Sequence, residues 1–83
     1  MKIYVGNLGF KVNDHDLEKV FSEYGTVSSA KIVKEKMTDR SRGFGFVEME
    51  NQNEAEKAIK GLDGATFQAR KLVVNEARPR KNS

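Results

Sequence analysis

The chain has 83 residues, no cysteine and one histidine, and it carries a formal net charge of +3. This length fits one domain with a single core, and a chain without cysteine excludes a disulfide framework, a thiolate metal site and a cysteine nucleophile. No apolar run in the sequence approaches the roughly 20 residues that span a bilayer, so we expect no membrane partner and a cytoplasmic protein, or a nuclear one in a eukaryote.

Positive charge is concentrated in two segments, although the net charge is modest. Residues 31–42 carry a local charge of +3 and residues 70–83 one of +4, whereas the rest of the chain sums to −4. Clustered cations of this kind suit a polyanionic partner. Many solvated loops and tails are also basic, so this observation alone does not choose between the two interpretations.

The first half of the chain predicts a strand, a helix and a second strand. Residues 2–6 alternate between polar and apolar, as a half-buried strand does, and residues 14–24 place apolar side chains at helical spacing. Asn13 is a good N-cap for this helix, and Gly25 predicts its end. The second strand is expected over residues 27–34.

The second half of the chain predicts the remaining elements after a polar loop. A third strand is expected over residues 42–49, a second helix over residues 52–62 and a last strand over residues 71–76. Asn51 and Glu54 have the spacing of a capping box at the start of the second helix.

The order β-α-β-β-α-β is the split βαβ, or ferredoxin-like, arrangement. We therefore expect an α+β fold in which two helices cover one face of a four-stranded antiparallel sheet. Residues 1–77 would form this domain, and residues 78–83 a flexible basic tail. The chain has no further segment to cover the other face of the sheet, so we look for the function of the protein there.

The strand over residues 42–49 is the most informative segment, because its alternation separates two different faces. One face carries two phenylalanines between two charged side chains: Arg42, Phe44, Phe46 and Glu48. The other face carries two glycines and two apolar side chains: Gly43, Gly45, Val47 and Met49. If the phenylalanines packed beneath the helices, both charges would be buried with them, at a cost of several kcal/mol. The opposite register exposes the rings and lets the glycines bring the helices close to the strand.

The first strand predicts the same orientation independently. Its alternation places Tyr4 on the open face if Ile3 and Val5 face the core. Three aromatic rings then share one surface with four polar side chains: Lys2, Lys31, Arg42 and Asn75. Exposed rings invite aggregation unless they bind a ligand, and a ring beside a cation suits a base and its phosphate. Stacking is worth roughly 1–3 kcal/mol per base, and we favour this interpretation over a purely structural one.

These segments resemble the motifs of a known family. Residues 42–49 are similar to the octapeptide of the RNA recognition motif, K/R-G-F/Y-G/A-F-V-x-F/Y, with Met49 in place of the last aromatic residue. Met49 is expected to face inward, so this departure bears on packing. Residues 3–8 resemble the hexapeptide motif of the family, and the likeness covers residues 2–77. The short chain is similar to the stand-alone, single-domain bacterial members.

The resemblance implies a role for each matching residue. Tyr4 and Phe46 would each stack on a base, and Phe44 would lie against the riboses. Arg42 would pair with a phosphate. Further contacts with RNA are implied at flanking positions: Lys2, Asn7, Lys31, Asn75, Ala77 and Arg78. The first and third strands would lie at the centre of the sheet. Asp39 stands where many members carry a glycine, so we infer no specificity for that loop.

The leading hypothesis is therefore a monomeric, non-catalytic domain that binds short single-stranded RNA without a cofactor or metal, as a post-transcriptional regulator or RNA chaperone. Single-stranded DNA stays an alternative ligand, because only contacts to the 2′-hydroxyl distinguish the two. A protein-interaction domain with the same fold is the second hypothesis.

The third hypothesis is a small hydrolase resembling acylphosphatase, which needs an arginine and an asparagine aimed at one phosphate or carbonyl. The turn at residues 6–9 is the only candidate, and it has no arginine. His15 has no partner at ligand spacing, so we interpret it as a solvated helix residue.

Overall fold

The structure, a computed structural model, describes residues 1–38 and 40–77. Six of its elements match the order that the sequence predicts: β1 (Lys2–Gly6), α1 (Asp14–Ser22), β2 (Ser29–Lys34), β3 (Ser41–Glu48), α2 (Gln52–Leu62) and β6 (Val73–Glu76). Several bounds differ from the prediction by one or two residues, as is usual where elements fray.

A hairpin between α2 and β6 was not predicted. It consists of β4 (Thr66–Phe67) and β5 (Arg70–Lys71), and it shortens the last strand of the sheet at its start. Gln68 and Ala69 form its turn with φ angles of 50° and 68°. Two-residue turns of this kind usually contain asparagine or glycine, so the sequence carried none of the ordinary signals for the hairpin.

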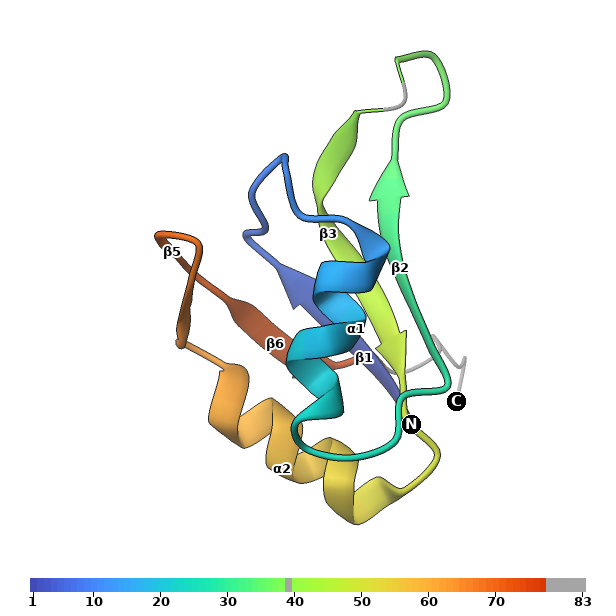
Figure 1. The fold of residues 1–83 in the computed structure, drawn as a ribbon, viewed down its shortest axis with the longest axis vertical. Helices are drawn as coiled ribbons and strands as arrows, with labels where there is room; N and C mark the ends of the chain where they lie inside the picture. Colours follow the sequence, from blue (N-terminus) through green and yellow to red (C-terminus); the bar gives the residue numbers. More distant parts are fainter. Residues whose placement is uncertain (39, 78–83) are drawn as a thin grey trace, which may run out of the picture.

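The main sheet is antiparallel and has the order β2-β3-β1-β6, which places β3 and β1 at its centre as predicted. Both helices lie on one side of this sheet, and the other side stays open among the described elements (Figure 1). The α+β, ferredoxin-like fold expected from the sequence is confirmed.

One apolar core fills the space between the helices and the sheet. Its members come from every main element, and those with an exposed fraction of 2% or less include Ile3, Val5, Leu17, Phe21, Val47, Ala55, Ala58 and Val74. Met49 is also fully buried, so the departure from the octapeptide pattern faces inward as expected. Among the described residues no polar or charged side chain is buried, so burial of apolar surface holds this domain together.

The N-terminal cap of α2 differs from the prediction, whereas that of α1 forms. At α1 the Asn13 side chain accepts from the Asp16 amide, and the Asp16 carboxylate accepts from the Asn13 amide, which makes a full capping box. At α2 only half of the predicted box forms, because Asn51 accepts from the Glu54 amide while the Glu54 carboxylate turns away. It accepts instead from the Thr26 amide, 3.2 Å away in the chain segment that follows α1.

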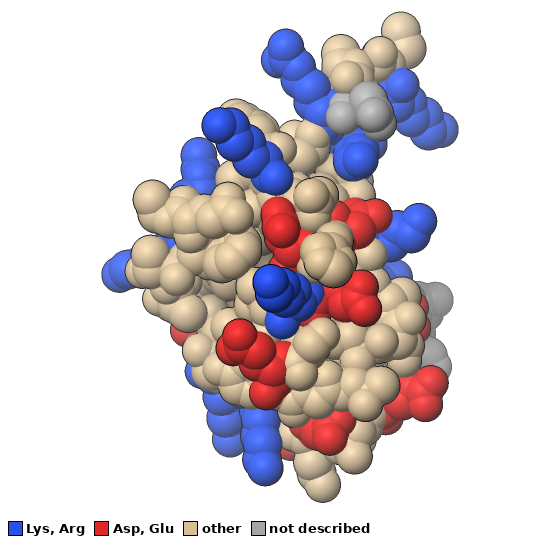
Figure 2. Space-filling model, viewed as in Figure 1, with Lys and Arg blue, Asp and Glu red and all other residues tan. Residues whose placement is uncertain are grey.

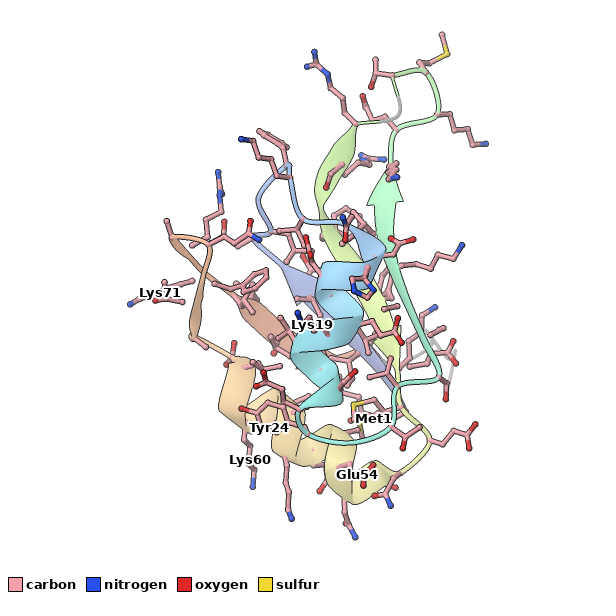
Figure 3. The ribbon with its side chains drawn as sticks, viewed as in Figure 1. Met1, Lys19, Tyr24, Glu54, Lys60 and Lys71 are labelled. Atoms are coloured by element: carbon pink, nitrogen blue, oxygen red, sulfur yellow. The ribbon has the colours of Figure 1, made fainter. Side chains whose placement is uncertain are left out.

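Gly25 serves this contact rather than the end of α1. The helix ends at Ser22, and Glu23 is its C-cap, so the prediction that Gly25 stops the helix is wrong. A Cβ atom at Gly25 would overlap the carboxylate of Glu54. Figure 3 shows Glu54 at the start of α2, where this helix lies beside the chain segment that follows α1. Because Gly25 has no side chain, the Glu54 carboxylate can reach the Thr26 amide and join α2 to the segment that follows α1.

An aspartate ties each helix to an edge strand. The Asp14 carboxylate, at the start of α1, accepts from the Ile32 amide of β2 at 2.8 Å. The Asp63 carboxylate, at the C-cap of α2, accepts from the Val74 amide of β6 at 3.0 Å. These bonds hold both helices over the same face of the sheet. Neither helix packs against the opposite face.

The glycines of β3 also act differently from the prediction, which assigned them to close packing of the helices. A Cβ atom at Gly45 would overlap the Lys31 carbonyl oxygen and lie 3.0 Å from Ile32 Cα, so Gly45 allows close approach of the neighbouring strand β2. Gly43 has φ 85°, near the register shift between β2 and β3. Such irregularities re-aim side chains at the end of a strand.

We expect Gly45→Ala to destabilise the domain by about 1–3 kcal/mol, because the added methyl group meets backbone that cannot rotate away. Gly9→Ala is the matched control, since the nearest atom to a Cβ there is the Arg70 Cδ at 3.9 Å. Urea unfolding measures both free energies. A Gly45→Ala variant as stable as Gly9→Ala would show that the two strands are not packed so closely.

Candidate nucleic-acid interface

Three aromatic rings form a continuous surface on the open face of the sheet, which we call the ring platform: Tyr4, Phe44 and Phe46. Their centroids lie 5.8 to 6.1 Å apart, with tilted or edge-to-face contacts between each pair. Each ring is partly buried by its neighbours and keeps part of its surface in solvent. The strand alternation predicted this outward orientation, and the fully buried Ile3, Val5 and Val47 on the other face agree with it.

Strand pairing builds a row of side chains across the platform. Tyr4 lies opposite Phe46 on one side and opposite Asn75 on the other, and Lys31 lies opposite Phe46 on β2. Because paired residues point to the same face, the row runs Lys31, Phe46, Tyr4, Asn75 from one edge to the other. The predicted residues Lys31 and Asn75 thus flank the two rings that are expected to stack.

A second row of the sheet contains Lys2, the basic residue of β1. Lys2 lies opposite Glu48, and its Nζ atom is 4.8 Å from the centroid of the Phe46 ring. This distance is that of a cation–π contact. The Ala77 amide donates to the Lys2 carbonyl at 2.8 Å, so Ala77 continues the sheet beside Lys2. The last predicted residue, Arg78, lies outside the described residues.

Arg42 stands at the end of the platform next to a shallow groove of about 360 Å³. Tyr4 and Phe44 line this groove together with Arg42, Arg70 and Phe10. The groove combines aromatic surface with guanidinium groups, which is the pairing that a base and its phosphate require.

Asn7 uses its side chain within the protein. Its Nδ2 donates to the Lys71 carbonyl at 2.6 Å, and its Oδ1 accepts from Arg70 Nη1 at 3.0 Å. The residue also has φ 59°, a left-handed conformation that asparagine tolerates better than most residues. Asn7 therefore joins the turn after β1 to the β5 hairpin, and an RNA contact at this position would compete with these bonds.

The same bonds bear on the hydrolase hypothesis. The sequence offered no arginine for the turn at residues 6–9, whereas the fold brings Arg70 against Asn7. The Asn7 amide group that a substrate oxygen would need already donates to the Lys71 carbonyl. The arrangement thus favours a structural link over a catalytic pair.

Sequence reasoning missed Phe10, whose side chain is 77% exposed. It lies in the loop between β1 and α1, where no period assigns a side chain to a face. The available signal was chemical: a large aromatic residue between Gly9 and Lys11 in a polar turn has no local partner to bury it.

The described residues contain no candidate metal site. His15 is exposed on α1, as expected. Within residues 1–38 and 40–77 no group of three or more histidine, cysteine or acidic side chains has the arrangement of a metal site. In the same part of the chain no helix has the length and apolarity to cross a membrane.

Comparison with known proteins identifies the family. The family model described as RNA recognition motif matches residues 3–73. The chain belongs to this family. It is 53% identical to RbpE of Nostoc sp., a protein named for RNA binding, over 98% of this chain and 82% of the relative. It is 50% identical to RbpA of Synechocystis sp., over 99% of this chain and 81% of that protein.

Solved structures of RNA-binding proteins have the same fold. The crystal structure of RNA Binding Protein PG1 is similar with a TM-score of 0.93 and 50% identity, covering 99% of both chains. A Sex-lethal protein/RNA complex is similar with a TM-score of 0.90 and 29% identity, covering 99% of this chain and 49% of that one.

We expect Asn7→Ala to lower stability by about 1–3 kcal/mol, because it removes two hydrogen bonds and forces alanine into a left-handed conformation. Asn7→Gly separates the two effects, since glycine accepts this backbone geometry but lacks the amide. Thermal or urea unfolding of both variants is the measurement. If Asn7→Ala has the same free energy of unfolding as the parent, the link to the hairpin contributes nothing to stability.

Proposed function

We propose that this protein is a non-catalytic RNA-binding domain that holds a short single strand on the ring platform. The observation that carries the proposal is the position of the three rings. They lie in contact with one another, face solvent and are flanked by cations on the face that no described element covers. An apolar surface maintained in water in this way is typical of a binding site.

In this proposal, Tyr4 and Phe46 each stack on one base, and Phe44 lies against the riboses between them. Stacking tolerates any base, because every base has a π-face. Arg42 pairs with a phosphate at the end of the platform, while Lys2 and Lys31 neutralise backbone charge along its sides. Asn75 and Ala77 offer polar backbone and side-chain groups to base edges, which is where sequence preference would arise.

Family membership and the named relatives support RNA as the ligand. RbpE and RbpA are named for RNA binding, and the similar Sex-lethal structure is a complex with RNA. The family also supports a binding domain rather than an enzyme. The intact set of three rings favours RNA over the protein-interaction hypothesis. Because the relatives are named for RNA binding, we also propose a role as a post-transcriptional regulator or RNA chaperone, in the cytoplasm.

The helix side of the molecule is less suited to a polyanion. Figure 2 shows acidic side chains gathered over the middle of this side, with most basic side chains at its margins. A phosphate backbone crossing α1 would meet these carboxylates. The charge distribution therefore supports the sheet and its adjoining loops as the place where RNA binds.

The variant Phe44→Ala/Phe46→Ala should bind labelled random-sequence single-stranded RNA at least roughly fivefold more weakly, because the base stacked on Phe46 and the ribose contact of Phe44 are lost. Fluorescence polarisation measures the dissociation constant, and circular dichroism checks that the variant stays folded. Met37→Ala is the control, since Met37 is 93% exposed and lies outside the platform. Parent-like affinity in the double variant would refute stacking on the platform.

Salt dependence tests where the backbone charge is neutralised. Lys31→Gln should reduce the steepness of the log Kd against log salt plot by about 0.7, the contribution of one phosphate contact on a single strand. Lys57→Gln removes an exposed lysine from α2 and should leave the slope unchanged. Equal changes in the two variants would mean that the attraction is spread over the whole surface rather than directed to the sheet.

A further inference from the structure

We propose that the bound strand continues beyond the ring platform into a second nucleotide site, built from two loops at one end of the sheet. We call this the loop site and define it by Phe10, Lys11, Lys34 and Arg40. In it, a base stacks on the Phe10 ring and the adjoining phosphate lies among the three cations. The inference rests on the proposed function of the platform, because the same strand occupies both sites.

The first observation is that Phe10 is held out into solvent. Its side chain is 77% exposed, whereas Leu8 and Val12 on either side are 3% exposed and belong to the core. The Val12 amide donates to the Gly9 carbonyl at 3.2 Å, which closes a tight turn around Phe10. The Leu8 amide donates to the Gly43 carbonyl at 2.8 Å, which attaches this turn to β3. The ring is thus presented by an anchored turn, and this limits the entropy lost when a ligand binds.

The second observation is a hollow of about 470 Å³ beside this ring. Its walls come from the β1–α1 loop, with Phe10 and Lys11, and from the neck of the β2–β3 loop, with Lys34 and Arg40. The volume is in the range of roughly 300–1,000 Å³ that sites for small ligands occupy. None of the described residues that line the hollow is acidic.

The cations of the loop site are held near the hollow by the backbone. Lys34 pairs with Ser41 at the last position of the β2–β3 ladder, and the Glu35 amide donates to the Arg40 carbonyl at 2.9 Å. These contacts close the neck of the loop, so the positions of Lys34 and Arg40 are set by the sheet. Figure 2 shows basic side chains gathered at the end of the molecule where Figure 1 places this loop.

The third observation is continuity with the ring platform. Phe10 lines the hollow and also lines the groove that contains Tyr4, Phe44 and Arg42. Its ring is therefore a wall shared by the two depressions. A strand that leaves the Phe44 ring passes Arg42 and reaches Phe10 without crossing an acidic side chain among the described residues of either lining.

These features together favour a nucleotide of the same strand as the occupant. The aromatic ring supplies a stacking surface, and the three cations complement a phosphate. An apolar peptide would leave the cations without counter-charges, and an acidic peptide would leave the ring in water. A strand already held on the platform also reaches the loop site at high effective concentration, which strengthens a contact that is weak by itself.

Phe10→Trp tests the stacking contact directly, because the chain contains no tryptophan. We expect a random RNA pool of about eight nucleotides to quench the emission of this indole, and a pool of about three, which the platform alone accommodates, to leave it unchanged. Asn53→Trp, on the exposed side of α2, is the control and should not respond to either pool. Unchanged Phe10→Trp emission while polarisation shows saturation with the longer pool would overturn the loop site and leave the platform intact.

Phe10→Ala tests the energetic contribution. Binding of the longer pool should weaken roughly tenfold, whereas binding of the shorter pool should match the parent. Equal affinity of variant and parent for the longer pool would contradict the inference, and so would an equal loss for both pools, since that would place Phe10 within the platform itself. If the parent binds neither pool, the proposed function fails and the loop site fails with it.

Discussion

The register between β1 and β3 governs both the core and the candidate site. In this pairing Ile3 lies opposite Val47 and Tyr4 opposite Phe46, so apolar side chains and rings occupy separate faces. A slip of one residue would move every side chain to the other face. It would expose valine and isoleucine side chains that each contribute about 1.5–3 kcal/mol by burial, and it would bury charged neighbours of the rings. The core and the ring platform are therefore two results of one pairing.

The register exposes the rings only because both helices cover the same side of the sheet. Asp14 and Asp63 accept backbone amides from the two edge strands, which fixes α1 and α2 over the same face. Glu54 then joins the start of α2 to the segment after α1 through the Thr26 amide. With both helices held in this way, no described element covers the opposite face, and its rings remain accessible to a flat ligand.

Several details were wrong or missing in the sequence analysis for one physical reason. Glu54 has the right spacing for a capping box, but its carboxylate finds a donor in a segment that is distant in the chain. Gly45 was expected to accommodate a helix, but it accommodates strand β2 instead. The β4–β5 hairpin forms around Gln68 and Ala69, which are not ordinary turn residues. In each case a contact between segments that are distant in the chain decides the outcome.

The sequence by itself determined the order of the main elements, the buried face of each strand and the outward orientation of Tyr4, Phe44 and Phe46. These follow from side-chain periods of two and 3.6 residues, which are local properties of the backbone. Only the tertiary structure brought Arg70 to Asn7 and placed the Phe10 turn between the platform and the β2–β3 loop. Loops have no period, so their positions depend on bonds between distant residues, such as that from Leu8 to Gly43.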